Sequence, residues 1–380
     1  MSSPRILITG GGTAGHVLPA IAVADALVHR GYRKEEIGFV GSARGMEGRL
    51  VPQAGYAISL LPGRGLVRRI TPTNVEAMLG LVHAVLRATL LVARHRPRVI
   101  VSVGGYASVP LSLAGALLRV PIVIVNVDAV AGLANRLVGH FATASCVAFA
   151  GTGLPHEVVT GAPVRTTILA TDRSVSARRS ARQALGVGNT QRLLVVMGGS
   201  LGARSINAAA LDVAARHRDD EALVIIHLVG DRNYAEVVKR SESLSLGDRY
   251  RPLAYSDEMP MLYSAADLIV GRAGAMSVAE LSAVGVPAIL VPLPHAPNDH
   301  QRRNAQALVD AGSAVLIEDG QLDGPRLDEA ISRLFDVPLQ LQMMEERAAS
   351  LEGHGGAEAI AVVIAEVIAN VGLGGAPAGR

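Results

Sequence analysis

The chain has 380 residues, 49% of them hydrophobic and 18% charged, which is enough for two domains with full cores. Its single cysteine, Cys146, excludes a disulfide framework and a cysteine-rich zinc site. No uncharged apolar run is long enough to span a membrane, and the first residues lack the basic and apolar pattern of a cleavable signal. We therefore expect a cytoplasmic protein.

Positive charge is concentrated in the first part of the chain. Residues 1–165 contain 16 Lys and Arg against 7 Asp and Glu, whereas the remaining residues contain 20 against 26. A basic half predicts an anionic partner, such as a phospholipid surface or a phosphate-bearing substrate. A solvated arginine-rich surface is the alternative. Nucleic acid is disfavoured, because only 3% of the residues are aromatic and no nucleic-acid motif is present.

Short β-branched runs alternate with longer alanine-rich segments, which is typical of parallel sheets covered by helices. The expected strands are residues 5–9, 37–40, 58–61, 99–103 and 122–125 in a first series, and 193–197, 223–228, 268–270 and 288–291 in a second. A helix is expected at residues 18–29. The pattern predicts an α/β protein with two Rossmann-like domains, whose parallel sheets face an interdomain cleft with ligands at the carboxyl ends of the strands.

Each expected domain begins with the same succession of elements: a strand, a glycine turn and a helix. We place the N-terminal domain at residues 1–165 and the C-terminal domain at residues 166–352. The polar, arginine-rich stretch 163–190 marks the junction. Residues 353–380 are expected to form a helix and a flexible tail.

The first glycine turn is Gly10-Gly11-Gly12-Thr13-Ala14-Gly15-His16, which contains the G-x-G-x-x-G pattern of a dinucleotide site. Such a site also needs an acid at the end of the second strand. Here that strand ends Phe39-Val40-Gly41-Ser42, so a nicotinamide or flavin enzyme is disfavoured. Two interpretations remain: backbone amides and a helix N-terminus that attract a phosphate, or a tight turn alone.

Two further glycine turns follow expected strands. Gly104-Gly105-Tyr106 lies in the first half, and Gly198-Gly199-Ser200-Leu201-Gly202-Ala203 lies in the second. One diphosphate hardly needs three such turns. The sequence therefore predicts more than one phosphate-bearing ligand.

Residues 271–304 are the most informative stretch. A helix that starts near Ala275 suits a diphosphate at its N-terminus, and Glu280 on that helix could accept both hydroxyls of a ribose, although a solvated glutamate is the ordinary alternative. Asp299-His300-Gln301 suits sugar hydroxyls. A metal site from His295, Asp299 and His300 is much the weaker interpretation, and we expect neither a metal nor a cofactor.

The motifs GGGTAGHV, GGYAS, GAPVR, GGSLGA and GRAGAMSVAELSAVGVPAILVP occur in this order over almost the whole chain. Together they resemble the MurG family, within the family 28 glycosyltransferases of GT-B fold. The resemblance implies transfer of N-acetylglucosamine from UDP-N-acetylglucosamine to undecaprenyl-diphospho-muramoyl-pentapeptide in peptidoglycan synthesis. It also implies that the C-terminal domain binds the donor, and that the N-terminal domain binds the acceptor at the cytoplasmic face of the membrane, as a peripheral protein.

The resemblance further implies site residues. It assigns the ribose to Glu280, the diphosphate to the helix start at Ala275, Met276 and Ser277, and the sugar to Gln301. Arg165 and Ser200 are implied near the diphosphate or nucleotide, and Tyr255 and Ser256 at the uracil. The implied acceptor residues are Gly12, Thr13, Ala14, Gly15, Gly104, Gly105, Tyr106 and Asn126.

The implied chemistry is an inverting single displacement, in which a base removes the proton of the attacking hydroxyl and UDP leaves. Where the family usually reads His-Glu-x-Asn, this chain reads Val125-Asn126-Val127-Asp128. The base therefore stays open between His16 and Asp128. Two other functions stay open as well: a related enzyme with a different acceptor, as in secondary metabolism, and a non-catalytic homologue that binds nucleotide sugars or lipid diphosphates.

Residues 63–98 combine apolar helix positions with several arginines. The apolar residues are Val75, Met78, Leu79, Val82, Val85, Leu86, Leu90 and Leu91, and the arginines are Arg64, Arg68, Arg69, Arg87, Arg94, Arg96 and Arg98. A basic rim of this kind contributes about 1 kcal/mol per arginine near an anionic bilayer. We therefore predict salt-sensitive binding to an anionic membrane surface.

Overall fold

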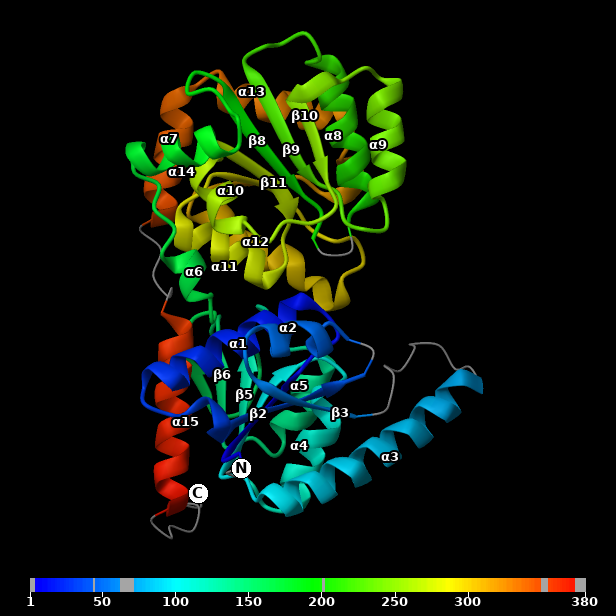
Figure 1. The fold of residues 1–380 in the computed structure, drawn as a ribbon, viewed down its shortest axis with the longest axis vertical. Coiled ribbons are helices and arrows are strands. Elements are labelled where there is room, and N and C mark those ends of the chain that lie inside the picture. Colours follow the sequence, from blue (N-terminus) through cyan, green and yellow to red (C-terminus); the bar gives the residue numbers. More distant parts are fainter. Residues whose placement is uncertain (1–3, 44, 62–71, 200–201, 350–354, 373–380) are drawn as a thin grey trace. The chain divides into compact units, whose positions relative to one another are not determined.

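The structure is a computed structural model that describes residues 4–43, 45–61, 72–199, 202–349 and 355–372. The chain divides into two compact units, each with its own sheet (Figure 1). Unit 1 comprises Met1–Arg165 and Gly353–Arg380, and unit 2 comprises Thr166–Glu352. The C-terminal helix therefore belongs to unit 1. From the sequence, residues 353–380 were expected to be separate from both domains.

Unit 1 contains a seven-stranded parallel sheet in the order β3-β2-β1-β4-β5-β6-β7. Its strands are β1 (Ile6–Gly10), β2 (Ile37–Ser42), β3 (Ala57–Leu61), β4 (Val99–Gly104), β5 (Ile122–Asn126), β6 (Ala144–Val147) and β7 (Glu157–Val159). Its helices are α1 (Ala14–His29), η1 (Lys34–Glu36), α2 (Glu47–Gln53), α3 (Pro72–His95), α4 (Ser108–Leu117), α5 (Leu133–Gly139) and α15 (Gly356–Gly372).

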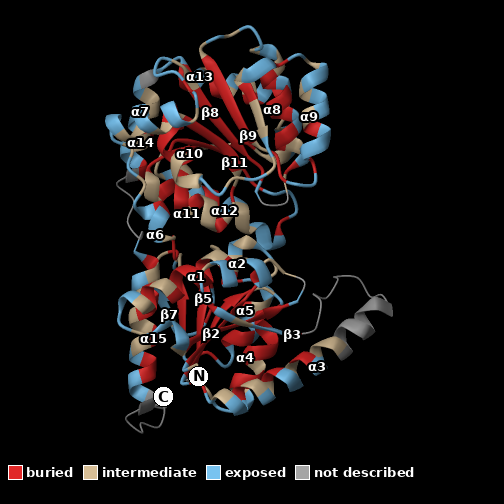
Figure 2. Cartoon of the chain, viewed as in Figure 1, coloured by how far each residue is buried: buried red, intermediate tan, exposed pale blue. Residues whose placement is uncertain are grey.

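The helices of unit 1 form two groups. Helix α1 contacts α2 and α15, whereas α4 contacts α3 and α5. Right-handed crossovers between parallel strands place such groups on opposite faces of the sheet. The central strands between them are buried (Figure 2), and the core includes Leu7, Ile100 and Ile122 together with Ala88 of α3 and Leu111 of α4.

Unit 2 contains a six-stranded parallel sheet in the order β10-β9-β8-β11-β12-β13. Its strands are β8 (Arg192–Met197), β9 (Leu223–Leu228), β10 (Tyr250–Leu253), β11 (Leu268–Arg272), β12 (Ala288–Val291) and β13 (Ala314–Leu316). Its helices are α6 (Thr166–Leu169), α7 (Val175–Ala184), α8 (Arg204–Arg216), α9 (Tyr234–Ser243), η2 (Gly247–Arg249), α10 (Met259–Ala265), α11 (Ala275–Val284), η3 (Pro297–Asp299), α12 (His300–Asp310), η4 (Asp319–Gln321), α13 (Gly324–Phe335) and α14 (Pro338–Ala349).

Both sheets are doubly wound. In unit 1 the strand order reverses between β1 and β4, and in unit 2 it reverses between β8 and β11. Open α/β sheets bind ligands outside the carboxyl ends of the strands at such a reversal. The reversal in unit 1 is flanked by two of the predicted glycine turns, after β1 and β4, and the reversal in unit 2 by the third, after β8, and by the start of the 271–304 stretch, after β11.

All nine runs that were expected to be strands are strands. Helix α1 begins at Ala14, four residues before the expected start, so His16 lies in its first turn. In the part of the chain that the structure describes, no helix is both long and apolar enough to cross a membrane.

Candidate active site

The turns after β1, β2 and β4 meet at the carboxyl edge of the unit 1 sheet. A Cβ atom on Gly105 would lie 2.5 Å from the carbonyl oxygen of Gly11, and the φ of Gly105 is +78°, so only glycine fits this approach. The Tyr106 hydroxyl donates to the hydroxyl of Ser42 over 3.0 Å. The structure therefore brings the predicted acceptor residues of the first two glycine turns together.

The carboxylate of Glu47 lies beneath these turns and was not predicted as a site residue. Its side chain is buried and accepts hydrogen bonds from the backbone amides of Gly12, at 3.0 Å, and Ser42, at 2.7 Å. Three glycines make room for it, since a Cβ on any of them would come within 2.5 Å of Glu47: Gly11, Gly41 and Gly45. The amide of Gly12, which the sequence analysis offered to a phosphate, is thus used by a protein carboxylate.

His16 lies in the first turn of α1, beside the turn after β4. A Cβ on Gly104 would lie 3.3 Å from Cδ2 of the His16 ring, and the His16 Nδ1 lies 3.4 Å from the Thr13 hydroxyl. Burial lowers the pKa of His16 below its usual 6.5, and the carboxylates of Asp128 and Glu47 oppose this shift. The imidazole is therefore neutral at pH 7 and able to accept a proton.

The segment that departs from the family pattern forms a hydrogen-bonded loop after β5. The Asn126 side chain donates to the carbonyl of Asp128 over 2.7 Å and accepts from Asn135 Nδ2 over 3.0 Å. Asn126 is buried, as are its neighbours Val125 and Val127. The Asn126 amide thus holds the loop, and Asp128 is its partly exposed member; the assignment of Asn126 to the acceptor stays a prediction.

In unit 2, the turns after β8 and β11 bound the predicted donor site. A Cβ on Gly202 would lie 2.4 Å from the carbonyl oxygen of Val229, and the φ of Gly202 is +76°. Gly274 is the N-cap of α11, which starts at Ala275 as predicted. The Asn304 side chain donates to the carbonyl of Ala273 over 3.3 Å and holds this turn. The first amides of a helix have no intrahelical partner, so α11 offers donors and a positive dipole end to an anion.

Glu280, the predicted ribose ligand, lies in the second turn of α11 and is buried. The hydroxyl of Tyr263 donates to its Oε2 over 2.8 Å. The ordinary alternative for Glu280, a solvated helical glutamate, is therefore wrong. Tyr263 was not predicted as a site residue, because it lies 17 residues before Glu280 and on another helix.

Three other predicted donor residues lie at the same edge of this sheet. Tyr255 and Ser256 follow β10, and the Ser256 hydroxyl accepts from the amide of Glu258 over 3.1 Å. Gln301, in the first turn of α12, accepts from the backbone amide of Leu293 over 2.9 Å and so fixes the loop after β12. Parallel strands point their carboxyl ends to one edge, which is why residues from separate strands gather here.

Two predicted donor residues fall outside this geometry. Ser200 lies outside the described residues. Arg165 is the last residue of the first segment of unit 1, so it is not part of the unit 2 edge. Both assignments stay predictions.

Arg272, at the end of β11, is engaged within unit 2. Its guanidinium pairs with the Asp319 carboxylate and donates to the Ser205 hydroxyl and the Pro292 carbonyl, each at 3.0 Å. The charge of Arg272 is thus balanced by Asp319, which weakens any attraction of Arg272 for a phosphate. The contact with Ser205 links the turn after β11 to the start of α8.

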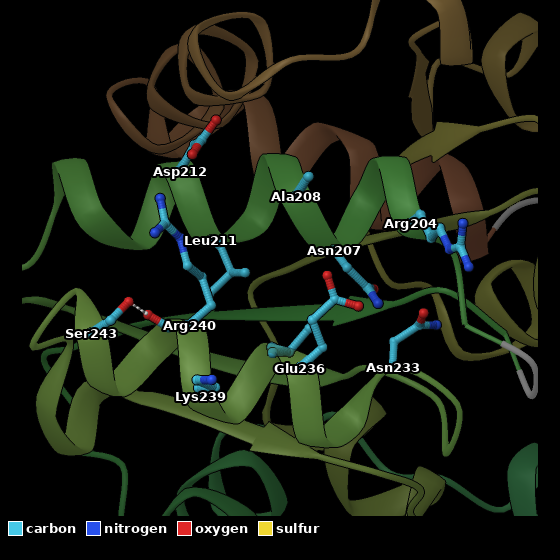
Figure 3. Close-up of a pocket in the computed structure, with 11 residues that line it drawn as sticks. Arg204, Asn207, Ala208, Leu211, Asp212, Asn233, Glu236, Lys239, Arg240 and Ser243 are labelled. Carbon is cyan, nitrogen blue, oxygen red and sulfur yellow. Dashed lines mark hydrogen bonds between the residues drawn. The ribbon is translucent and has the colours of Figure 1, made fainter.

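A cavity of about 640 Å³ lies between α8 and α9 (Figure 3). Charged side chains of both signs line it, including Arg204, Asp212, Glu236 and Lys239. None of the predicted donor residues that the structure describes is among its lining residues. The candidate site is therefore the strand edge and not this cavity. Across the described ranges, no group of three or more His, Cys, Asp and Glu residues is placed to hold a metal ion.

Comparison with known proteins bears on both units. The family model of the glycosyltransferase family 28 N-terminal domain matches residues 6–147, and that of the family 28 C-terminal domain matches residues 193–361. The chain is 38% identical to the UDP-N-acetylglucosamine--N-acetylmuramyl-(pentapeptide) pyrophosphoryl-undecaprenol N-acetylglucosamine transferase of Moorella thermoacetica, over 96% of this chain and 99% of the relative. The chain belongs to the family 28 glycosyltransferases.

Other relatives of this family 28 glycosyltransferase have the same name or a similar structure. It is 37% identical to the enzyme of the same name from Cutibacterium acnes, over 95% of this chain and 96% of the relative. The crystal structure of Acinetobacter baumannii MurG is similar with a TM-score of 0.71 and 26% identity, over 95% of this chain and 99% of that one. The predicted fold class, α/β with two Rossmann-like units of GT-B type, is confirmed, as is the prediction that the protein is a hexosyltransferase.

Proposed function

We propose that this protein transfers N-acetylglucosamine from UDP-N-acetylglucosamine to the lipid-linked N-acetylmuramoyl-pentapeptide of peptidoglycan synthesis. The observation that supports this most strongly is its 38% identity, over 96% of the chain, to an enzyme of that name. The two strand edges support it independently, since each carries a different set of polar groups at a reversal of strand order. Unit 2 takes the donor, and unit 1 takes the acceptor.

In unit 2, the N-terminus of α11 binds the diphosphate of UDP through the amides of Ala275, Met276 and Ser277. Glu280, farther along the same helix, accepts the ribose hydroxyls. The uracil lies at Tyr255 and Ser256, and the sugar lies at Gln301. The family resemblance assigns Ser200 of unit 2 and Arg165 of unit 1 to the donor as well. As UDP leaves, negative charge grows on its diphosphate, and the dipole of α11 stabilises that charge.

In unit 1, the acceptor hydroxyl is deprotonated at the edge formed by His16 and Asp128. When Nδ1–H of His16 donates to the Thr13 hydroxyl, Nε2 is left to accept the proton. The oxygen of the acceptor forms a bond to the anomeric carbon, and the bond from that carbon to the phosphate oxygen breaks, with inversion. Asp128 stabilises the imidazolium that results. The turns at Gly104 and Tyr106 bind the acceptor diphosphate.

We also propose that unit 1 binds the cytoplasmic face of the membrane peripherally. Helix α3 buries Ala84, Ala88 and Val92 and exposes Val82, Leu86 and Leu90 by 58%, 61% and 69%. These three are four residues apart and form one stripe. Exposed Arg87 and Arg94 lie on the same helix. An apolar stripe with basic neighbours suits an anionic interface.

Helix α5, which also contacts α4, adds a second stripe of exposed apolar side chains. It consists of Leu133 and Leu137 of α5, together with Phe141 in the turn that follows the helix. Arg64, Arg68 and Arg69 lie outside the described residues, and the side chains of Val75, Met78 and Leu79 are not described. The proposal rests on the two stripes and on the arginines of the described part of α3.

The membrane proposal is tested by sedimentation with phosphatidylglycerol vesicles and phosphatidylcholine vesicles at low and high salt. We expect binding to the anionic vesicles that salt weakens, and a loss of binding in the triple variant Val82→Ser, Leu86→Ser, Leu90→Ser. Leu339→Ser removes an equally exposed leucine from unit 2 and serves as the matched control. Equal binding to both vesicle types, or unchanged binding in the triple variant, would refute the proposal.

A second candidate function is transfer of N-acetylglucosamine to a different acceptor. The segment Val125-Asn126-Val127-Asp128 favours it, because the histidine and glutamate usual in the family are absent and Asn126 is used within the loop. A panel of hydroxyl acceptors separates the two functions.

The activity itself is tested by measuring UDP release from UDP-N-acetylglucosamine with and without the lipid-linked muramoyl-pentapeptide. We expect release that depends on this acceptor and saturates with it. Release with another acceptor only would favour the second candidate. Binding of UDP without any turnover would identify a non-catalytic homologue.

A further inference from the structure

A buried pair of side chains connects the predicted ribose ligand to a neighbouring helix. Tyr263 of α10 is 0% exposed, and its hydroxyl donates to Oε2 of Glu280, which is 8% exposed, over 2.8 Å. A buried tyrosine hydroxyl usually has a partner. Here the partner is the carboxylate expected to bind the donor, so the contact bears on the donor site as well as on packing.

Helix α10 is itself held firmly at its C-terminal end. Arg173 donates to the backbone carbonyls of Tyr263 and, at 3.0 Å, of Ala266. Arg182 donates to the carbonyl of Ala265 over 3.2 Å. These carbonyls are among the last of the helix, where intrahelical partners are missing. The arginines replace those partners and fix the helix that carries the Tyr263 hydroxyl.

We propose that Tyr263 is a positioning residue: its hydroxyl orients the Glu280 carboxylate toward the ribose of UDP and so contributes to selection of ribose over 2′-deoxyribose. An ionised carboxylate offers about four acceptor positions, so a bond from Tyr263 is compatible with two from a ribose diol. A glutamate side chain has three rotatable bonds, and the hydrogen bond at Oε2 limits their freedom. A protein side chain that is already held in its binding orientation gives a higher affinity than a mobile one, because less conformational freedom is lost on binding. The inference rests on the proposed function, because it takes UDP as the ligand.

The test compares the dissociation constants of UDP and 2′-deoxy-UDP by calorimetry for the parent, Tyr263→Phe and a matched control, Tyr250→Phe. Tyr250 is a second buried tyrosine of unit 2, with its hydroxyl 2.6 Å from Nδ1 of His227. Each variant keeps the ring and loses one hydroxyl, so the two lose comparable folding contacts. A third comparison places Tyr263→Phe in a Glu280→Ala background, which isolates the pairwise contribution.

In the parent, we expect UDP to bind at least about tenfold more tightly than 2′-deoxy-UDP, as for a hydrogen bond to a charged group. Tyr263→Phe should weaken the binding of UDP about three- to tenfold and that of 2′-deoxy-UDP by about twofold or less. The preference for UDP, measured as the ratio of the two dissociation constants, therefore falls. Tyr250→Phe should leave both constants unchanged. In the Glu280→Ala background, Tyr263→Phe should have no further effect on UDP.

Equal weakening of the two nucleotides by Tyr263→Phe would reveal a merely structural role and overturn the assignment. A further loss in the Glu280→Ala background would overturn it as well, because the effect would then not pass through the carboxylate. Failure of the parent to bind UDP at all would overturn the proposed donor, and it is distinguishable because it appears before any substitution is made.

Discussion

The carboxylate of Glu47 accepts a hydrogen bond from the backbone amide of Gly12, 3.0 Å away and 35 positions earlier in the chain. Together with the bond from Ser42, this contact joins the first glycine turn to the end of the second strand. A dinucleotide site would have an acid at the end of that strand. This chain has Glu47 five residues later, and its carboxylate accepts hydrogen bonds from the backbone instead of from a ribose.

Replacement of Glu47 by alanine should destabilise unit 1. It leaves the buried amide of Ser42 and the partly buried amide of Gly12 without acceptors, and we expect the free energy of unfolding to fall by about 2 to 4 kcal/mol. Denaturant titration measures this fall. Glu35→Ala removes an exposed glutamate of the same unit and should cost less than about 0.5 kcal/mol. Equal effects of the two substitutions would show that the Glu47 contacts contribute nothing to stability.

Glu280→Ala should weaken UDP binding by about 1.5 to 3 kcal/mol, since a hydrogen bond to a charged group is lost. Calorimetry of the purified protein measures the change. Glu242→Ala, which removes an exposed glutamate of α9 in the same unit, is the control and should bind UDP like the parent. The ribose assignment fails if Glu280→Ala keeps the parent's affinity. NAD should bind to neither protein.

His16→Ala should lower turnover with the lipid acceptor by about 10²- to 10⁴-fold, as expected for loss of a general base, while UDP affinity is retained. Asp128→Asn should lower turnover less. The opposite order, with His16→Ala silent and Asp128→Asn inactive, would make Asp128 the base.

The pH dependence of kcat/KM gives an independent check on His16. Because burial lowers the pKa of His16, the imidazole stays neutral below pH 6.5, and activity should fall only at more acidic pH. The Asp128 carboxylate raises the pKa of His16, so Asp128→Asn should move this fall to still lower pH. A shift in the opposite direction would contradict the electrostatic account.

Unit 2 contains a pH-sensitive contribution to stability at His227. Burial between Tyr250 and Asn207 lowers the pKa of His227 from 6.5 to about 3. The unfolded chain takes up this proton near pH 6.5 and the folded chain only near pH 3, so the unfolded state binds more protons between these values and stability rises with pH there. Between pH 6.5 and 5, protonation of His227 in the unfolded state should lower the free energy of unfolding by about 1.5 kcal/mol. Denaturant unfolding of His227→Gln at both pH values should show a smaller fall than the parent, and an equal fall would place the titration elsewhere.

The sequence predicted the central strands because their runs of valine, isoleucine and leucine are buried on both faces. It missed β6, β7, β10 and β13, which have only three or four residues and lie at or next to the sheet edges. Such short strands carry little pattern of their own, and their neighbours in the sheet define them.

Among the candidate site residues, those on glycine turns were predictable, because a strand, a glycine and a helix in succession fix where a turn lies. Glu47 and Tyr263 were not, because each acts through a contact with a residue distant in sequence. The nearby glycines that make room for Glu47, Gly41 and Gly45, do not by themselves indicate a buried carboxylate. Asn126 was assigned to the acceptor from the family resemblance, and its hydrogen bond with Asn135, nine residues away, could not be predicted from the sequence.

The most direct test of the proposed function is analysis of the product formed from UDP-N-acetylglucosamine and the lipid-linked muramoyl-pentapeptide by mass spectrometry and by the NMR coupling constant of the new anomeric proton. The account predicts one added N-acetylglucosamine on the lipid-linked sugar, in β linkage, since a single displacement inverts the α configuration of the donor. An α linkage would contradict the displacement mechanism. Absence of the disaccharide, with transfer to another acceptor or to none, would contradict the proposed function.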